Sequence, residues 1–257
     1  MALFESGNPT LTEKIFNSAA TRNAAIQGTM SVRGTMNKFG FMLLMLMGAA
    51  TYTWNLYQTG NPGQMQTLMM VGIFGGMIAA FAIIFKPTWA PYIAPAYGLL
   101  EGLFIGGLSA VMNDMFQKSY PGLVMQAVGL TFGVAIAMFL LYNFRVIRAT
   151  EKFKSIIFSA TLGIAIFYGL TMLLRLFGVQ IDFISVGNNS TLAIGISLFV
   201  VAIAALNLIM DFDMIEKGAE AGAPKFMEWY GAFGLMVTIV WLYIEILKLL
   251  SRFAKRN

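Results

Sequence analysis

The sequence predicts an all-helical membrane protein with seven transmembrane helices. Of its 257 residues, 58% are hydrophobic and only 11% are charged, which is far more apolar surface than a soluble domain of this length needs. The apolar residues fall into seven long runs, and the basic residues lie at the ends of the loops between them. Each run is close to the ~20 residues with which a helix crosses the hydrocarbon core of a bilayer.

Residues 1–38 precede the first run and are polar, rich in Ser, Thr, Asn and Ala. A signal peptide would begin with a basic stretch followed by an apolar one, so we expect this segment to be a retained cytoplasmic tail. Its residues 12–26 fit a weakly amphipathic helix lying on the membrane surface. The remainder, residues 39–257, is predicted to form one transmembrane domain without a soluble domain or an internal repeat.

The loops between the runs are short, so consecutive helices are expected to be antiparallel neighbours. Proline and glycine mark the first three breaks, at residues 61–63, 86–87 and 121–122, and a basic loop follows the fourth run. The predicted spans are 39–58, 67–85, 92–113, 122–142, 155–177, 191–210 and 229–250.

The distribution of Lys and Arg predicts the orientation of the chain. Eleven of them lie in the N-terminal segment and in the second, fourth and sixth loops, whereas the other loops carry only Lys118 and Arg175. The N-terminus is therefore expected in the cytoplasm. Seven spans would place the C-terminus outside, although four basic residues lie between Lys248 and Arg256. Either the seventh helix crosses against the charge rule, or it is partly re-entrant.

The chain contains no cysteine and no histidine. This composition excludes disulfides, thiol nucleophiles, histidine bases and the usual zinc and haem ligands. The Gly-x-Gly-Asp signature of aspartyl intramembrane proteases is also missing, and we expect neither enzymatic activity nor a resident cofactor. The basic balance of the chain, with a pI near 9.4, indicates topology and contact with anionic lipid, not nucleic-acid binding.

Few acidic residues lie at membrane depth, and each is a functional-site hypothesis because a buried charge is costly there. Glu245 lies inside the seventh run, with Lys248 three residues later. Its alternative interpretation is a snorkelling ion pair near the interface. Asp211 ends the sixth run and shares a helix face with Asn207, four residues earlier, whereas Asp213 points elsewhere. The alternative for both aspartates, as for Glu216 and Glu220, is a solvated loop charge.

Glu101 lies in the middle of the third run, with Tyr97 one turn earlier. Gly98, Gly102 and Gly106 recur every four residues beside it, and such a stripe lets another helix approach closely. Glu101 is thus predicted to face protein. It fits an ion pathway or a protonated carboxyl that hydrogen-bonds across a helix interface.

Two carboxylates held close together in a low dielectric cannot both ionise cheaply, so such a pair shares a proton and titrates near neutral pH. Its oxygens can also bind hard cations. If Asp211 and Glu245 come within hydrogen-bonding distance, they form a pH-sensitive cation site.

Several motifs together resemble the Bax inhibitor-1 family of seven-helix membrane proteins, most closely a bacterial Bax inhibitor-1-like branch. The resemblance covers nearly the whole chain. It rests on Asn8-Pro9, Glu101-Gly102, the segment 211–215 (DFDMI), the segments 222–225 (GAPK) and 228–230 (EWY), and the segment 242–247 (LYIEIL).

The resemblance implies three helix hairpins around a central seventh helix, in a bacterial inner membrane. It also implies a pH-sensitive calcium leak controlled by one acid on each of the last two helices. Carried over by position, the first of these acids is Asp211, with Asp213 as the fallback, and the second is Glu245. Asp211 and Glu245 would bind calcium transiently. The family usually has aspartate at the second position, and the extra methylene of Glu245 shifts the carboxyl by about 1.5 Å.

Two other functions compete with the leak. Some bacterial relatives resemble inhibitors of a membrane-bound ATP-dependent protease, and that function would require residues 1–38 to bind a partner. A proton-coupled exchanger would instead include Glu101 in a proton relay.

Overall fold

The computed structural model describes residues 28–178 and 188–254, so the predicted surface helix at 12–26 lies outside the described residues. The described part contains seven helices that are long and apolar enough to cross a membrane, and its only β structure is a single bridge between Thr29 and Pro224. In chain order the elements are α2 (Val32–Gln58), α3 (Pro62–Phe85), the short η1 (Pro87–Trp89), α4 (Ala90–Phe116), α5 (Leu123–Asn143), α6 (Glu151–Leu176), α7 (Thr191–Glu220) and α8 (Met227–Ala254).

The seven predicted spans correspond one to one to these helices, but two helices extend well beyond the apolar runs. α2 begins at Val32, inside the segment predicted as a polar tail, and Ser31 caps it by accepting a hydrogen bond of 3.0 Å from the Gly34 amide. α7 continues ten residues past its predicted end, to Glu220. Hydropathy marks only the part of a helix that lies in hydrocarbon, so these polar extensions escaped the prediction.

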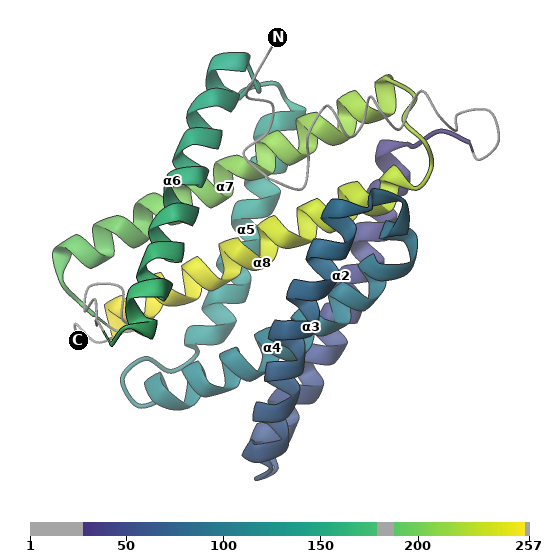
Figure 1. Ribbon diagram of the computed structural model, residues 1–257. Helices are drawn as coiled ribbons and strands as arrows, with labels where there is room; N and C mark the ends of the chain where they lie inside the picture. Colours follow the sequence, from purple (N-terminus) through teal and green to yellow (C-terminus); the bar gives the residue numbers. More distant parts are fainter. Residues whose placement is uncertain (1–27, 179–187, 255–257) are drawn as a thin grey trace.

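α8 is the central helix of the bundle, as the family resemblance implied. In its most apolar stretch 72% of the residues are buried inside the protein, compared with 17% in α6. Figure 1 shows α8 in yellow between the group α2–α4 and the pair α6–α7. It packs against α2, α4, α5 and α7, and the consecutive pairs α2–α3, α4–α5 and α6–α7 are in contact around it.

The glycine stripe of α4 allows the close approach that the sequence predicted. A Cβ atom at Gly102 would lie 2.3 Å from the carbonyl oxygen of Leu46, and one at Gly106 would lie 2.2 Å from that of Ala50. The backbones of α2 and α4 are therefore in direct contact, which is how helices gain packing energy in lipid, where the hydrophobic effect does not drive them together.

α8 runs without a break for 28 residues, about 42 Å at 1.5 Å per residue, so it is long enough to cross a membrane fully. Two of its terminal cations are engaged within the protein. Lys248 lies 3.0 Å from Glu245, and Arg252, only 5% exposed, donates to the carbonyl oxygen of Asn188 at 3.2 Å. An unbroken helix of this length favours the full crossing over the re-entrant alternative, and the orientation of the chain stays a prediction.

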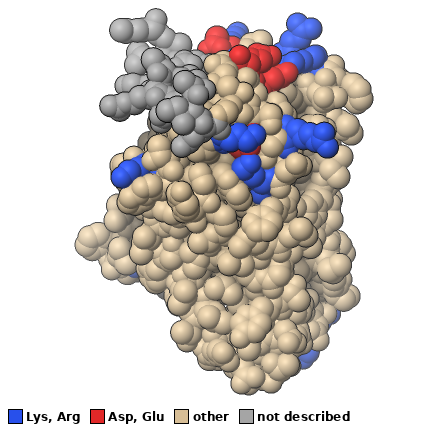
Figure 2. Space-filling model, turned by 90° about the vertical axis from the view of Figure 1, so that its right-hand side faces the viewer, with Lys and Arg blue, Asp and Glu red and all other residues tan. Residues whose placement is uncertain are grey.

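The outer faces of the helices are strongly apolar. Leu44 of α2 is 71% exposed and Ile78 of α3 is 67% exposed, as expected of side chains that contact lipid. On the face in Figure 2, charged side chains gather toward the upper end, where α2 and α8 begin in Figure 1, and the broad surface below is nearly free of them. The structure is thus that of a multi-pass membrane protein.

Replacement of Gly102 by alanine should destabilise the protein by about 1–3 kcal/mol, because the new methyl group forces α2 and α4 apart. Thermal unfolding in detergent measures the effect. Gly129→Ala in α5 is the matched control, since nothing lies within 4 Å of a Cβ atom at that position. Equal melting temperatures for the two variants would contradict the close packing of α2 on α4.

Candidate functional site

The polar side chains of α6 form one stripe along its inner face. Lys154, Thr161 and Tyr168 are spaced by seven residues, nearly two full turns, and therefore project in about the same direction. Each of them contacts a polar residue of α7 or α8 at a different depth in the bundle, as the following contacts show. α6 also packs on α7 through an apolar cluster that includes Ile157 and Ile164, so the stripe is one of two kinds of contact that attach it.

The first level of contacts along this stripe is at Lys154, which is 1% exposed. Its ammonium lies 3.3 Å from the Asp213 carboxylate and 3.1 Å from the Glu151 carboxylate. Asp213 also pairs with Lys217 at 2.9 Å. Asp213 lies within α7 and is only 8% exposed, so its interpretation as a solvated loop charge is wrong. Glu216 and Glu220 likewise belong to the last two turns of α7 and not to a loop.

At the second level, the side-chain amide of Asn207 donates to the hydroxyl of Thr161 at 2.9 Å and to the carbonyl oxygen of Ile203 at 2.8 Å. Its own side-chain oxygen is buried and accepts no hydrogen bond within the described part of the chain. Asn207 therefore places an unused oxygen between α6 and α7.

At the third level lies Glu245 of α8, which is 1% exposed. Tyr168 donates from 3.2 Å to the carboxylate, and Lys248 pairs with it at 3.0 Å. Buried Arg252 acts on the same carboxylate through its charge. The predicted ion pair with Lys248 is present, but its acid is enclosed and linked to α6, so it is more than a snorkelling pair at the interface.

Asp211 is fully buried, and the loop interpretation is wrong for it as well. The hydroxyl of Thr238 in α8 donates to its carboxylate at 2.5 Å. Thr238 and Glu245 are seven residues apart on α8, about 10 Å along the helix axis. The contacts described for the two carboxyls therefore lie at different levels of α8, and a direct pair between Asp211 and Glu245 stays a prediction.

Glu101 lies apart from this row. It belongs to α4, which Figure 1 shows on the opposite side of α8 from α6. Its carboxyl interacts with Tyr97, one turn earlier on the same helix, and a Cβ atom at Gly76 of α3 would lie 3.1 Å from it. Glu101 therefore faces protein, at the contact between α3 and α4.

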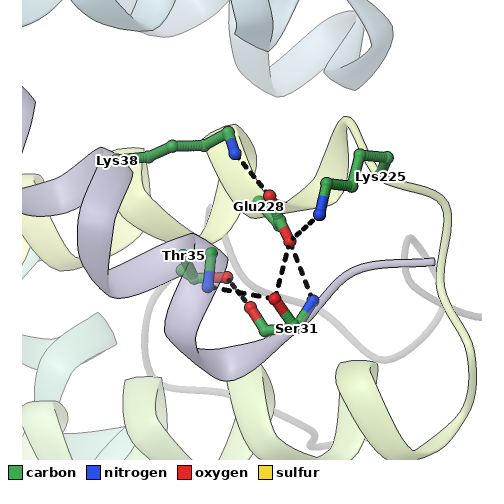
Figure 3. A network of polar contacts seen from close by, with 6 residues as sticks. Ser31, Thr35, Lys38, Lys225 and Glu228 are labelled. Atoms are coloured by element: carbon green, nitrogen blue, oxygen red, sulfur yellow. Dashed lines mark hydrogen bonds and ion pairs between the residues drawn. The ribbon is translucent and has the colours of Figure 1, made fainter. Parts of the chain in front are cut away.

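A further buried acid, Glu228, was not recognised as a site from the sequence. It lies in the first turn of α8 and has no exposed surface. Figure 3 shows four interactions converging on its carboxylate: the amide and hydroxyl of Ser31 donate at 2.9 and 3.0 Å, Lys225 donates at 2.8 Å, and Lys38 completes the set. The nearby sequence held one indication of this site, Lys225 three residues before Glu228. The other partners, Ser31 and Lys38, are about 190 positions from Glu228 in the sequence.

The backbone strengthens the same junction. The amide of Met30 donates to the carbonyl oxygen of Ala223 at 2.7 Å, and the amide of Lys225 donates to that of Gly28 at 3.0 Å. A Cβ atom at Gly34 would collide with the Glu228 carboxylate, so the start of α2 lies directly against it. We call residues 28–31, 38, 223–225 and 228 the clasp. It fastens the entry to α2 to the loop before α8.

A family model described as Bax inhibitor 1 like matches residues 8–255, nearly the whole chain. No curated protein and no solved structure matches the chain significantly.

Substitution of Glu228 by glutamine should lower the free energy of unfolding by about 1.5–3 kcal/mol, because Lys38 and Lys225 lose a charged acceptor at a buried position. Chemical or thermal unfolding of the purified protein measures this loss. Glu220→Gln, at an exposed position of α7, is the control and should change little. A Glu228→Gln protein as stable as this control would mean that the clasp does not hold the junction.

Proposed function

The chain belongs to the Bax inhibitor 1 like family, and on that premise we propose that it conducts a slow, pH-sensitive leak of cations, calcium foremost, across the membrane. The observation that carries this proposal is the row of buried polar side chains between α6, α7 and α8. Glu245, Asp211 and Asp213 lie in or beside that row with at most 8% of their surface exposed. Ionisable groups at membrane depth are costly, and proteins retain them there chiefly for ion or proton pathways.

The row offers the kind of ligands that calcium prefers. Carboxylate and amide oxygens bind hard cations, and Asn207 contributes an amide oxygen that no described group occupies. Within the described residues, no three acidic side chains converge as a metal-binding cluster. Asp211 and Glu245 would accordingly bind calcium only transiently, and conduction requires sites weak enough for the ion to leave.

The contacts of Glu245 suggest how protons would control the leak. Its negative charge holds Lys248 of α8 and accepts the hydrogen bond from Tyr168 of α6. Hydrogen bonds to charged groups are roughly twice as strong as those between neutral groups. Protonation of Glu245 would weaken the link to α6, and α6 would separate from α8. In this mechanism acidification opens the path.

Asp213 and Asp211 extend the same control to α7. Protonation of Asp213 would loosen its pairs with Lys154 and Lys217, and so free the other end of the stripe on α6. Asp211 would set the spacing of α7 and α8 through Thr238. Glu101 lies outside the row, and we assign it no role in this path.

Calcium flux into liposomes that contain the purified protein tests the proposal. Wild-type protein should conduct severalfold faster at mildly acidic pH than at neutral pH. Glu245→Gln should conduct at neutral pH about as fast as acidified wild type, because the charge that holds α6 is absent. Asp211→Asn should also lose its dependence on pH.

Asp114→Asn is the matched control, since Asp114 is an exposed acid at the end of α4, outside the row. It should keep the wild-type pH profile. Absence of flux at any pH, from protein shown to be folded and inserted, would refute the leak. A pH dependence that persists in both Asp211→Asn and Glu245→Gln would refute the assigned control.

One observation favours a second candidate function, the regulation of a membrane protease or stress response through the N-terminal segment. The clasp fixes the point at which residues 1–27 join the transmembrane domain. Deletion of residues 1–27 should abolish a cellular phenotype if this function is the relevant one, and should leave calcium flux unchanged. If the phenotype survives the deletion but disappears in Glu245→Gln, the regulatory function is refuted.

A further inference from the structure

We propose that a pocket on the lipid-facing side of α8 binds one acyl chain of a membrane phospholipid. The pocket has a volume of about 240 Å³ and lies among α2, α4, α5 and α8, away from the polar row. The inference rests on this pocket alone and does not depend on the proposed leak.

Two helices form the walls of the pocket and two others its floor. Leu43, Met47 and Trp54 of α2 stand on one side, and Val128 and Phe132 of α5 stand on the other. α4 and α8 contribute the floor between them. The walls come from helices that are not sequential neighbours, so the pocket forms only when the helix bundle is assembled.

The few polar groups that line the pocket are already satisfied. The hydroxyls of Ser109 and Tyr243 are hydrogen-bonded to each other at 2.6 Å, and Ser109 also donates to the carbonyl oxygen of Ile105 at 2.6 Å. Thr131 donates to the carbonyl oxygen of Ala127 at 2.7 Å. A water molecule needs two to four polar partners, and an apolar pocket does not supply them. An apolar occupant fits this lining, and a hydrated ion does not.

The position of the mouth identifies the occupant as lipid. Met47 at the rim is 47% exposed, and the rim is continuous with the apolar outer faces of α2 and α5, where Leu44, Met125 and Leu130 are 71%, 75% and 48% exposed. In a membrane these faces contact hydrocarbon, so the molecules that reach the mouth are lipids. The volume of about 240 Å³ is far larger than the ~30 Å³ of one water molecule in the liquid, which suits part of one acyl chain.

A bound chain would contact the central helix directly. Ile239, Val240 and Tyr243 of α8 face the pocket, and Tyr243 precedes Glu245 by two residues. The chain would also fill the space between α2 and α5, because void space in a packed interior forfeits dispersion contacts. The structure thus assigns the lipid a supporting place in the bundle, between α8 and the bilayer.

Native mass spectrometry of the protein, purified from membranes in mild detergent, tests the assignment. Wild type should retain one phospholipid per chain. Val128→Phe fills the pocket from the α5 wall and should reduce this occupancy at least fivefold. Leu130→Phe adds the same ring to the same helix but outside the pocket, and should retain the lipid as wild type does.

Equal lipid occupancy in folded Val128→Phe and Leu130→Phe would overturn the assignment, as would absence of retained phospholipid from wild type or retention of a different amphiphile. If Val128→Phe does not fold, Leu43→Phe fills the pocket from the α2 wall and gives the same comparison. A second readout is the fluorescence of Trp54 as the sole tryptophan, in vesicles of phospholipid with brominated acyl chains. Trp54 should be quenched more strongly in the Leu130→Phe variant than in the pocket-filling variant. Equal quenching of Trp54 in the two variants would count against the site.

Discussion

A polar side chain that a helix carries into hydrocarbon must find its partner inside the protein, because lipid offers none. Much of the structure around α8 follows from this constraint. Glu245 is satisfied by Lys248 on its own helix and by Tyr168 on α6, and Asp211 is satisfied at least by Thr238. These requirements bring α6 and α7 to one side of α8. The polar groups are therefore part of the attachment of α6, and they are the groups to which the proposed leak assigns a function.

The two sides of α8 are held by different forces. On one side, Gly102 and Gly106 let the backbones of α2 and α4 touch, and this backbone contact involves no charged group. On the other side, α6 combines an apolar cluster against α7 with hydrogen bonds and ion pairs to Asp213, Asn207 and Glu245. In the proposed mechanism, protonation of two of these partners, Asp213 and Glu245, changes the attachment of α6.

The sequence predicted the fold well because apolar runs and glycine spacing are local signals. All seven spans, the central last helix and the close approach at Gly102 are confirmed. The partners of the acids were not predictable in the same way. Tyr168 and Glu245 are 77 residues apart, and Ser31 and Glu228 are 197 residues apart, so only the packing of the bundle brings each pair together. One usable signal was overlooked, namely the seven-residue spacing of polar side chains on α6.

In the proposed mechanism, α6 is the element that moves when Glu245 and Asp213 are protonated. Because the chain has no cysteine, spin labels can be placed only where cysteines are introduced, at exposed Met172 of α6 and exposed Tyr52 of α2. The distance between the labels should increase from neutral to mildly acidic pH in the wild-type background. In a Glu245→Gln background it should already be long at neutral pH. A distance that is the same at both pH values, and unaffected by Glu245→Gln, would contradict the account.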